Sequence, residues 1–561
     1  MSAKRLKLGP NNSCPCGSGQ KYKNCHGRQR LDLPFLIQQA RIEKHVFEEG
    51  KRLLDQQRAR EIQRQQQQGL GRPIISVEHK GMRFVAVGGL LCYGKWKTFF
   101  DFLGDYIKQV LGSDWGNGEL KKPFEERHPI LKWYHHLCSL QREFIKVPGQ
   151  VSSSPMTGAV SAYYRLAYNL YLIAHNGADI QTRLLSRLRN TDNFPGAFFE
   201  TQAAAWMIKA GFELEFENES DMSRTHCEFT ATYPPTKAKF SVEAKSRNPG
   251  VNNEGPKGLS VGRQLRRALE KQADHPRLVF VDLNIPLQSQ QQANRVFDRA
   301  ERVLKRFEDI KIAGQPAPPA YICLTNISDH YFLESANCPV AASFRGYNIQ
   351  DFMGSQFSSL RAALRAREKH LEMFELWKSM EKHLHIPSTF DGELPSAAFS
   401  DGQTTRMIIG QTYLTPGPDG VEVPARLTTA TVDNINGEMV LAFHDPRTEK
   451  SWISNAPMTP AELEDYKRYP DTFFGIHLEQ GGRAESPIEL FDFFYKTYRN
   501  TPKEKILEWM GTAEDFAQLK ELSQKDLSET YCERLIYGIM AQQEAAKKNK
   551  TRDPSSPASN P

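Results

Sequence analysis

The stretch from Phe198 to Lys245 constrains the fold of this chain more strongly than any other part of the sequence. It opens with FFETQAAAWMIKAGFELEF, continues through THCEF and closes with FSVEAK. The periodicity predicts one amphipathic helix followed by three short strands. A carboxylate falls on the helix and on each of the last two strands, and a lysine follows the last carboxylate by two residues. We therefore expect an α/β core that brings these charged groups together.

The two acidic strands follow the alternation of a half-buried sheet. In FSVEAK, Glu243 and Lys245 share one face, opposite the apolar side chains of the same strand. In THCEFTA, Glu228 falls on the face opposite Cys227 and Phe229. If the two strands pair as antiparallel neighbours, Glu228 lies beside Glu243 and Lys245.

Glu200 falls near the middle of the apolar face of the predicted helix, beside Ala203 and Met207. A carboxylate in that position needs a partner, because burying it alone is costly. That partner is either a metal site or, in the simpler alternative, a salt bridge or a helix cap.

These groups suit metal-assisted chemistry on phosphate esters. Glu228, Glu243 and a backbone carbonyl form a hard oxygen site for Mg²⁺ or Mn²⁺. Such an ion lowers the pKa of a water molecule and neutralises phosphate charge. We expect Lys245 to position or deprotonate the attacking water, and Glu200 to orient a metal-bound water or a second ion.

The order of elements resembles the PD-(D/E)XK nuclease superfamily, which has a restriction-endonuclease-like α/β core of helix-strand-strand-strand-helix-strand. The resemblance implies a catalytic set of Glu200, Glu228, Glu243 and Lys245, with Gln264 on the helix VGRQLRRALEKQ as an assisting residue. This sequence departs from the family in having Glu228 where an aspartate is usual. The alternatives are an ordinary sheet with surface ion pairs and a family member that has lost its activity.

The N-terminal segment SCPCGSGQKYKNCHG supplies the potential metal ligands Cys14, Cys16, Cys25 and His26. Three thiols and one imidazole suit structural zinc in a closed tetrahedral site. The segments CPCGSG and KYKNCHG resemble the SEC-C zinc module. The resemblance implies a zinc-stabilised unit that docks to a protein or nucleic acid; the alternative is a chance grouping of reduced cysteines.

The rest of the sequence predicts a multidomain α+β chain. The loop RNPGVNNEGPKG, residues 247–258, is either a lid over the site or a plain connector. We expect these segments: a zinc module at 1–30, a helical spacer at 31–70, a mostly helical domain with a hairpin at 71–190, a nuclease-like domain at 191–330, a helical segment at 331–390, a β-rich and helical C-terminal domain at 391–548 and a disordered tail at 549–561.

Composition is compatible with this interpretation without requiring it. The net charge of +7 tolerates a polyanionic partner. No apolar run approaches the length of a membrane span, and the lysine-rich start leads into no signal core, so we expect a cytoplasmic protein with no membrane partner. The expected function is metal-dependent hydrolysis of DNA or RNA phosphodiesters. The family resemblance associates this activity with defence or repair. A homo-oligomer is a further expectation. The alternative is a non-enzymatic adaptor built on an inactive nuclease-like scaffold.

Overall fold

The computed structural model describes most of the chain: residues 9–14, 16–25, 33–177, 180–217, 227–247, 260–336, 340–349, 351–352, 357, 359–400, 406–478, 484 and 486–552. Three predictions therefore fall at least partly outside the described residues, namely those for His26, for the loop at 247–258 and for the tail at 549–561. Among the helices that are described, none has both the length and the apolar character needed to cross a membrane.

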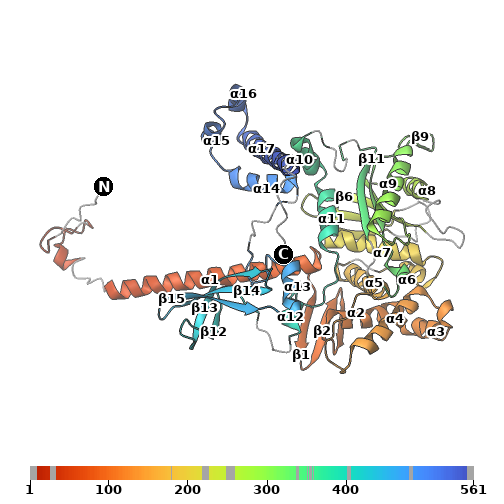
Figure 1. The fold of residues 1–561 in the computed structure, drawn as a ribbon, viewed down its shortest axis with the longest axis horizontal. Coiled ribbons are helices and arrows are strands. Elements are labelled where there is room, and N and C mark those ends of the chain that lie inside the picture. Colours follow the sequence, from red (N-terminus) through yellow and green to blue (C-terminus); the bar gives the residue numbers. More distant parts are fainter. Residues whose placement is uncertain are drawn as a thin grey trace. The chain divides into compact units, whose positions relative to one another are not determined.

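The chain is a mixed α/β protein that divides into two compact units. The first comprises Met1–Ile62 and Thr405–Leu478, and the second comprises Gln63–Thr404 and Glu479–Pro561. Helix α1 (Leu33–Gln68) runs from the first unit into the second (Figure 1). The finer domain boundaries expected from the sequence stay predictions; the division at residue 478 falls within the segment predicted at 391–548.

A six-stranded sheet in the order β11-β10-β7-β6-β5-β4 forms the core of the second unit. Its strands are β4 (Glu213–Phe216), β5 (Phe229–Tyr233), β6 (Ala238–Ser246), β7 (Arg277–Asp282), β10 (Ala320–Asn326) and β11 (Ala341–Tyr347). Strands β4, β5 and β6 pair antiparallel, β6, β7 and β10 pair parallel, and β11 is antiparallel to β10. Parallel neighbours need a crossover, which α8 (Val261–Leu269) and α9 (Gln290–Arg306) provide.

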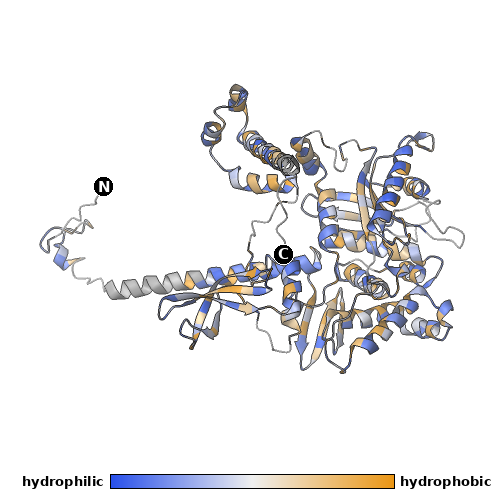
Figure 2. Cartoon of the chain, viewed as in Figure 1, coloured by the Kyte–Doolittle hydropathy of each residue, from blue (hydrophilic) through white to orange (hydrophobic). Residues whose placement is uncertain are grey.

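The two faces of this sheet pack against different helices. Phe240, Val242 and Phe280 belong to one apolar core together with residues of α7 (Phe194–Lys209). Val279 and Val281 belong to a second core with residues of α8 and α9. Figure 2 shows hydrophobic residues gathered on the strands of the sheet and on the helices beside them. Because side chains alternate along a strand, each face has its own set of neighbours.

A helical layer containing a small antiparallel sheet packs on the α7 side. Helix α5 (Gly158–His175) is buried along most of its length, and it packs against α7 and against two helices of this layer, α2 and α4. The other elements are β1 (Ile75–His79), β2 (Met82–Val87), β3 (Leu90–Gly94), α2 (Phe99–Leu111), α3 (Ser113–Leu120), η3 (Phe124–Glu126), α4 (Pro129–Phe144) and α6 (Thr182–Arg189). Thr98 and Asp101 form a capping box that fixes the start of α2.

The remaining elements of the second unit are mostly short helices. They are β8 (Lys311–Ile312), β9 (Gln315–Pro316), η5 (Asp329–Tyr331), α10 (Leu360–Lys369), α11 (Leu371–Lys382), α12 (Pro395–Ala398), α14 (Pro487–Tyr498), α15 (Lys503–Trp509), α16 (Phe516–Glu521) and α17 (Gln524–Arg552). Ion pairs of Arg365 with Glu529 and of Arg367 with Asp492 join α10 to α17 and α14.

The first unit contains a four-stranded antiparallel sheet in the order β12-β13-β14-β15. Its elements are η1 (Tyr22–Asn24), β12 (Thr412–Pro416), β13 (Glu422–Asp433), β14 (Glu438–Asp445), β15 (Lys450–Pro457) and α13 (Pro460–Arg468). The turn between β13 and β14 is NING, residues 434–437, and Gly437 there has a φ of +67°. A positive φ of this kind favours glycine because it has no Cβ.

Candidate functional site

Glu228 directly precedes β5, and Glu243 lies on the neighbouring strand β6. Strands β5 and β6 are antiparallel, and Phe229 pairs with Val242. The backbone N–H of Glu228 also donates to the carbonyl oxygen of Val242 at 2.9 Å, one residue out of the register that pairs Phe229 with Val242. Both carboxylates lie beside the same two ammonium groups, those of Lys245 and Lys271. The structure therefore brings the two predicted carboxylates together on the face that α8 covers.

Two lysines lie between these carboxylates. The Nζ of Lys245 contacts Oε1 of Glu243 and lies 3.5 Å from Oε1 of Glu228. The Nζ of Lys271, which follows α8, lies 2.8 Å from Oε1 of Glu243 and 3.4 Å from Oε1 of Glu228. The two carboxylate oxygens are thus no farther apart than the sum of these last two distances, about 6.2 Å. Lys245 is the predicted lysine, whereas no motif or periodicity marks Lys271 in the sequence.

Burial and charge shift the pKa values of the two carboxylates in opposite directions. Glu243 is only 1% exposed, and burial, followed by the negative charge of Glu228, raises its pKa to about 7. Burial also opposes ionisation of Glu228, but Lys271, Lys245 and Arg187 together outweigh it and lower the pKa of Glu228. Burial disfavours the charged form of Lys271, yet the two glutamates raise its pKa. Glu228 therefore carries the firmer negative charge, and Glu243 is poised to take a proton or a cation.

The two carboxylates have the chemistry needed to hold a divalent ion. The Oε2 atom of Glu243 is buried, and among the described residues it has no hydrogen-bond donor. Mg²⁺ favours oxygen ligands at about 2.0–2.1 Å, so an ion that binds both carboxylates requires them to move closer together and the ammonium of Lys271 to move aside. Two carboxylates are fewer ligands than such ions require, and water, backbone carbonyls or substrate oxygens would complete the shell.

Glu200 is buried as expected, being 3% exposed, and its described ion pair is with an arginine. The Nη2 of Arg187, on α6, donates to Oε2 of Glu200 at 2.7 Å. Helix α7 packs on the sheet face opposite Glu243. Because the charge of Arg187 also lowers the pKa of Glu228, Glu200 has an indirect electrostatic link to the cluster. This ion pair is the one expected under the salt-bridge alternative; the role of Glu200 towards a metal-bound water or a second ion stays a prediction.

Gln264 lies on α8 and is 8% exposed. Within the described part of the chain, its side chain makes no hydrogen bond to Glu228, Glu243 or Lys245. Its arginine neighbours are exposed and give α8 a basic outer face, formed by Arg263, Arg266 and Arg267.

Glu217, directly after β4, is a further carboxylate near Glu228. The backbone N–H of Glu217 donates to the carbonyl oxygen of Glu228 at 3.3 Å. Its Oε1 accepts a hydrogen bond from Thr230 at 3.2 Å. The alternation of FELEFE could have identified Glu217 from the sequence. Lys271 and Arg187 carry no such signal, because tertiary packing brings them to the cluster from a loop and from α6.

The N-terminal cysteines form a second cluster. The sulfur atoms of Cys14, Cys16 and Cys25 all lie within 4.8 Å of one another. The backbone N–H of Cys14 donates to the carbonyl oxygen of Gln20 at 2.8 Å, which closes the loop that carries Cys16. Three converging thiols could hold a soft metal such as zinc. The predicted fourth ligand, His26, lies outside the described residues.

Comparison with known proteins agrees with this second cluster. Residues 11–28 match the SEC-C motif family. The chain is 73% identical over 22 residues to the protein translocase subunit SecA of Rubrobacter xylanophilus, and 68% identical over 25 residues to that of Chlorobium phaeobacteroides. Each match covers 4% of this chain and 2% of the SecA chain. No solved structure matches the chain. The N-terminus thus carries a SEC-C motif with three cysteines that could bind a metal.

Proposed function

We propose that this protein is a divalent-metal-dependent nuclease that hydrolyses phosphodiester bonds in DNA or RNA. One observation carries the proposal. The carboxylates of Glu228 and Glu243 both lie beside the Nζ of Lys245, which follows Glu243 by two residues on β6.

The arrangement of elements supports a restriction-endonuclease-like core within the predicted 191–330 domain. Helix α7 is followed by the antiparallel strands β4, β5 and β6, then by α8, and then by β7 parallel to β6. This is the helix-strand-strand-strand-helix-strand order that the sequence predicts for a PD-(D/E)XK nuclease. In that interpretation, the acidic cluster lies at the middle of the four-stranded core.

The proposed mechanism assigns separate tasks to the charged groups. A divalent ion held by Glu228 and Glu243 would neutralise phosphate charge and make a water molecule more acidic. The Lys245 side chain is 24% exposed, against 2% for the Glu243 side chain, so Lys245 can meet both substrate and solvent. There it would hold the attacking water and offset the charge that develops on the phosphate. The exposed arginines of α8 would contact the phosphates of the nucleic-acid backbone.

A second candidate function has its own support in the structure. Lys271 contacts both glutamates, so the two carboxylates face two ammonium groups and the cluster is neutral without a metal. Such a self-neutralised cluster suits a structural role. The chain would then be a non-enzymatic adaptor in which the SEC-C motif docks to a protein partner.

Cleavage by the Lys245→Met variant discriminates between these functions. The purified chain is incubated with plasmid, single-stranded DNA and RNA, with Mg²⁺ or Mn²⁺ and with a chelator. We expect metal-dependent cleavage that Lys245→Met abolishes. Lys239→Met is the matched control, since Lys239 lies on the same strand and is exposed. Absence of cleavage on all three substrates, or equal cleavage by wild type and Lys245→Met, would exclude the nuclease and favour the adaptor.

A further inference from the structure

A cavity of about 270 Å³ lies on the α7 side of the central sheet, away from the acidic cluster. Ser246 and Asp282, the last residues of β6 and β7, pair in the parallel register and line it. Ser246 follows Lys245 directly, and alternation along β6 sends these two side chains to opposite faces. The cavity thus lies outside the carboxyl ends of parallel strands, where open α/β sheets commonly bind ligands.

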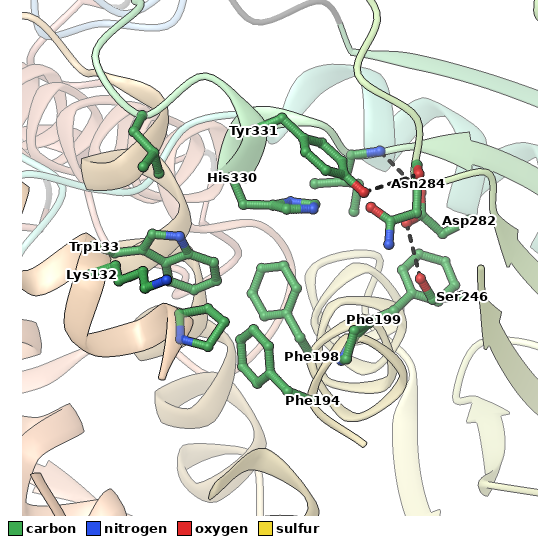
Figure 3. A pocket seen from close by; sticks show the side chains of 14 residues that line it. Lys132, Trp133, Phe194, Phe198, Phe199, Ser246, Asp282, Asn284, His330 and Tyr331 are labelled. Carbon is green, nitrogen blue, oxygen red and sulfur yellow. Dashed lines mark hydrogen bonds between the residues drawn. The ribbon is translucent and has the colours of Figure 1, made fainter. Parts of the chain in front are cut away.

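Aromatic side chains line one part of the cavity. Trp133 of α4 and Phe194 and Phe198 of α7 are all buried, and their ring centroids lie 5.5–5.6 Å from one another. Figure 3 shows these rings around one part of the space, with Ser246, Asp282 and Asn284 gathered at the other end. Aromatic walls pack well against a flat ring.

Asn284 presents an unpartnered acceptor at the polar end. The residue is 3% exposed, and its Nδ2 donates to the carbonyl oxygen of Arg247 at 2.7 Å. Its Oδ1 is buried and receives no hydrogen bond from the described residues. The backbone is held in the left-handed region, with φ +47°, and its carbonyl oxygen accepts from the hydroxyl of Tyr331 at 3.3 Å. A buried, rigidly held acceptor that lacks a donor is well placed to accept a hydrogen bond from a ligand.

His330 adds a second unpartnered group. Its Nδ1 is buried and makes no hydrogen bond within the described chain. Burial lowers the pKa of His330 to about 4, so the imidazole is neutral at physiological pH. A neutral imidazole offers one N–H and one lone pair. The cavity therefore has a free hydrogen-bonding edge on His330 as well as on Asn284.

The charge of the lining favours an uncharged ligand. Lys132 is the one cationic side chain in the described lining, and its ammonium already donates to the carbonyl oxygen of Glu125 at 2.7 Å. Asp282 accepts hydrogen bonds from Ser246, Thr325 and the backbone of Ile327, and burial raises its pKa to about 7. An anionic ligand would find no available cationic side chain among the described lining residues. A cationic ligand would find only Asp282, whose oxygens already accept hydrogen bonds.

We propose that this cavity binds an uncharged planar nitrogen heterocycle of the nucleobase class, which donates an N–H to Oδ1 of Asn284 while its ring packs among Trp133, Phe194 and Phe198. The volume suits a base or a nucleoside better than a larger ligand. The same chemistry has two sources, a free base or nucleoside and a base turned out of a nucleic-acid strand. The proposal does not depend on nuclease activity.

Ligand-observed NMR on the full chain tests this binding site. The probes are adenine, cytosine and uracil, their nucleosides, and 1,3-dimethyluracil, which keeps the uracil ring but has no N–H. We expect at least one unmethylated base or nucleoside to bind. If uracil is that base, 1,3-dimethyluracil should bind about tenfold more weakly, because the buried acceptor is then left unpaired. A short single-stranded oligonucleotide and its abasic counterpart distinguish a strand base from a free base.

Two variants and a control localise the binding. Asn284→Gly should reduce it about tenfold or more, since glycine tolerates the positive φ but removes the amide. Asn348→Gly is the matched control: Asn348 has φ +54° and donates to a backbone carbonyl, as Asn284 does, but lies outside the cavity lining. Leu333→Trp, at a partly exposed lining position, should fill the space and block binding if Asn284→Gly fails to fold. No binding by any base, nucleoside or oligonucleotide, or binding that neither variant weakens, would overturn the proposal.

Discussion

Lys209 offers a test of how deeply the second unit buries charge. It is the last residue of α7, is 6% exposed, and donates from Nζ to the carbonyl oxygen of His383 at 2.5 Å. Burial, followed by the charge of Arg165, lowers its pKa from 10.5 to about 7. In the unfolded chain the same ammonium regains an ordinary pKa, so the unfolded state binds more protons between these two values.

The neutral Lys209 therefore makes the folded protein more stable as the pH rises from 7 towards 10.5. Stability is greatest above the unfolded pKa and falls as the pH drops towards 7, because unfolding then gains a proton. At about 1.4 kcal/mol for each pH unit, the cost of keeping Lys209 neutral is about 4 kcal/mol at pH 7 and about 2 kcal/mol at pH 9. Lys209→Met removes this cost but leaves the carbonyl of His383 without its donor, a loss of about 1–3 kcal/mol. We expect the variant to be more stable than wild type at pH 7, with its advantage shrinking by about 2 kcal/mol at pH 9.

Urea unfolding followed by tryptophan fluorescence at several pH values between 7 and 9 measures this difference. The exposed Lys108, which pairs with Asp105 at 3.4 Å, supplies the control variant Lys108→Met. That control should follow wild type at every pH. If Lys209→Met also keeps a constant difference from wild type, then Lys209 is charged in the folded protein and the reasoning fails.

Three further predictions concern the metal sites and the cavity. Mg²⁺ at about one hundred times its dissociation constant should stabilise the wild type by about 2.7 kcal/mol, and Glu228→Gln should lose this rise in melting temperature. Native mass spectrometry should find one zinc ion per chain, which Cys16→Ser loses and Cys92→Ser keeps, because Cys16 belongs to the cysteine cluster and Cys92 does not. Equal zinc in both variants would contradict the assignment. Gly158→Ala should destabilise the chain by about 1–3 kcal/mol, because a Cβ there would lie 2.2 Å from the carbonyl oxygen of Asp329 in η5. An unchanged melting temperature would show that η5 can move.

Alternation along the strands predicted which face of the sheet carries Glu243 and Lys245. A period of two is enough to place Glu243 and Lys245 on one face and Phe240 and Val242 on the other. The same rule, applied to THCEF, placed Glu228 beside them once the strands paired. These are local properties of short segments, and they survive folding because a slip of one residue would move every apolar side chain out of the core.

Periodicity within one segment could not predict the partners that other segments supply. Helical periodicity indicated that Glu200 is buried and needs a partner, but it could not identify Arg187 on a preceding helix. The cavity depends on Asn284 in a left-handed conformation and on rings from two helices, and no periodic pattern marks such a convergence. Nor does any local signal place residues 405–478 in one compact unit with the N-terminal segment.

Among the partners that the sequence does not predict, Lys271 matters most for function. Glu228, Glu243 and Lys245 alone carry a net charge of −1 when ionised, which attracts a divalent ion, whereas Lys271 makes the cluster neutral. An ion entering between the carboxylates would have to displace this ammonium. Lys271→Met should therefore increase the Mg²⁺-induced rise in melting temperature over that of wild type at equal Mg²⁺, with Lys239→Met unchanged. If Lys271→Met shows an equal or smaller rise, Lys271 does not compete with a metal, and its contacts with the two glutamates belong to the folded scaffold alone.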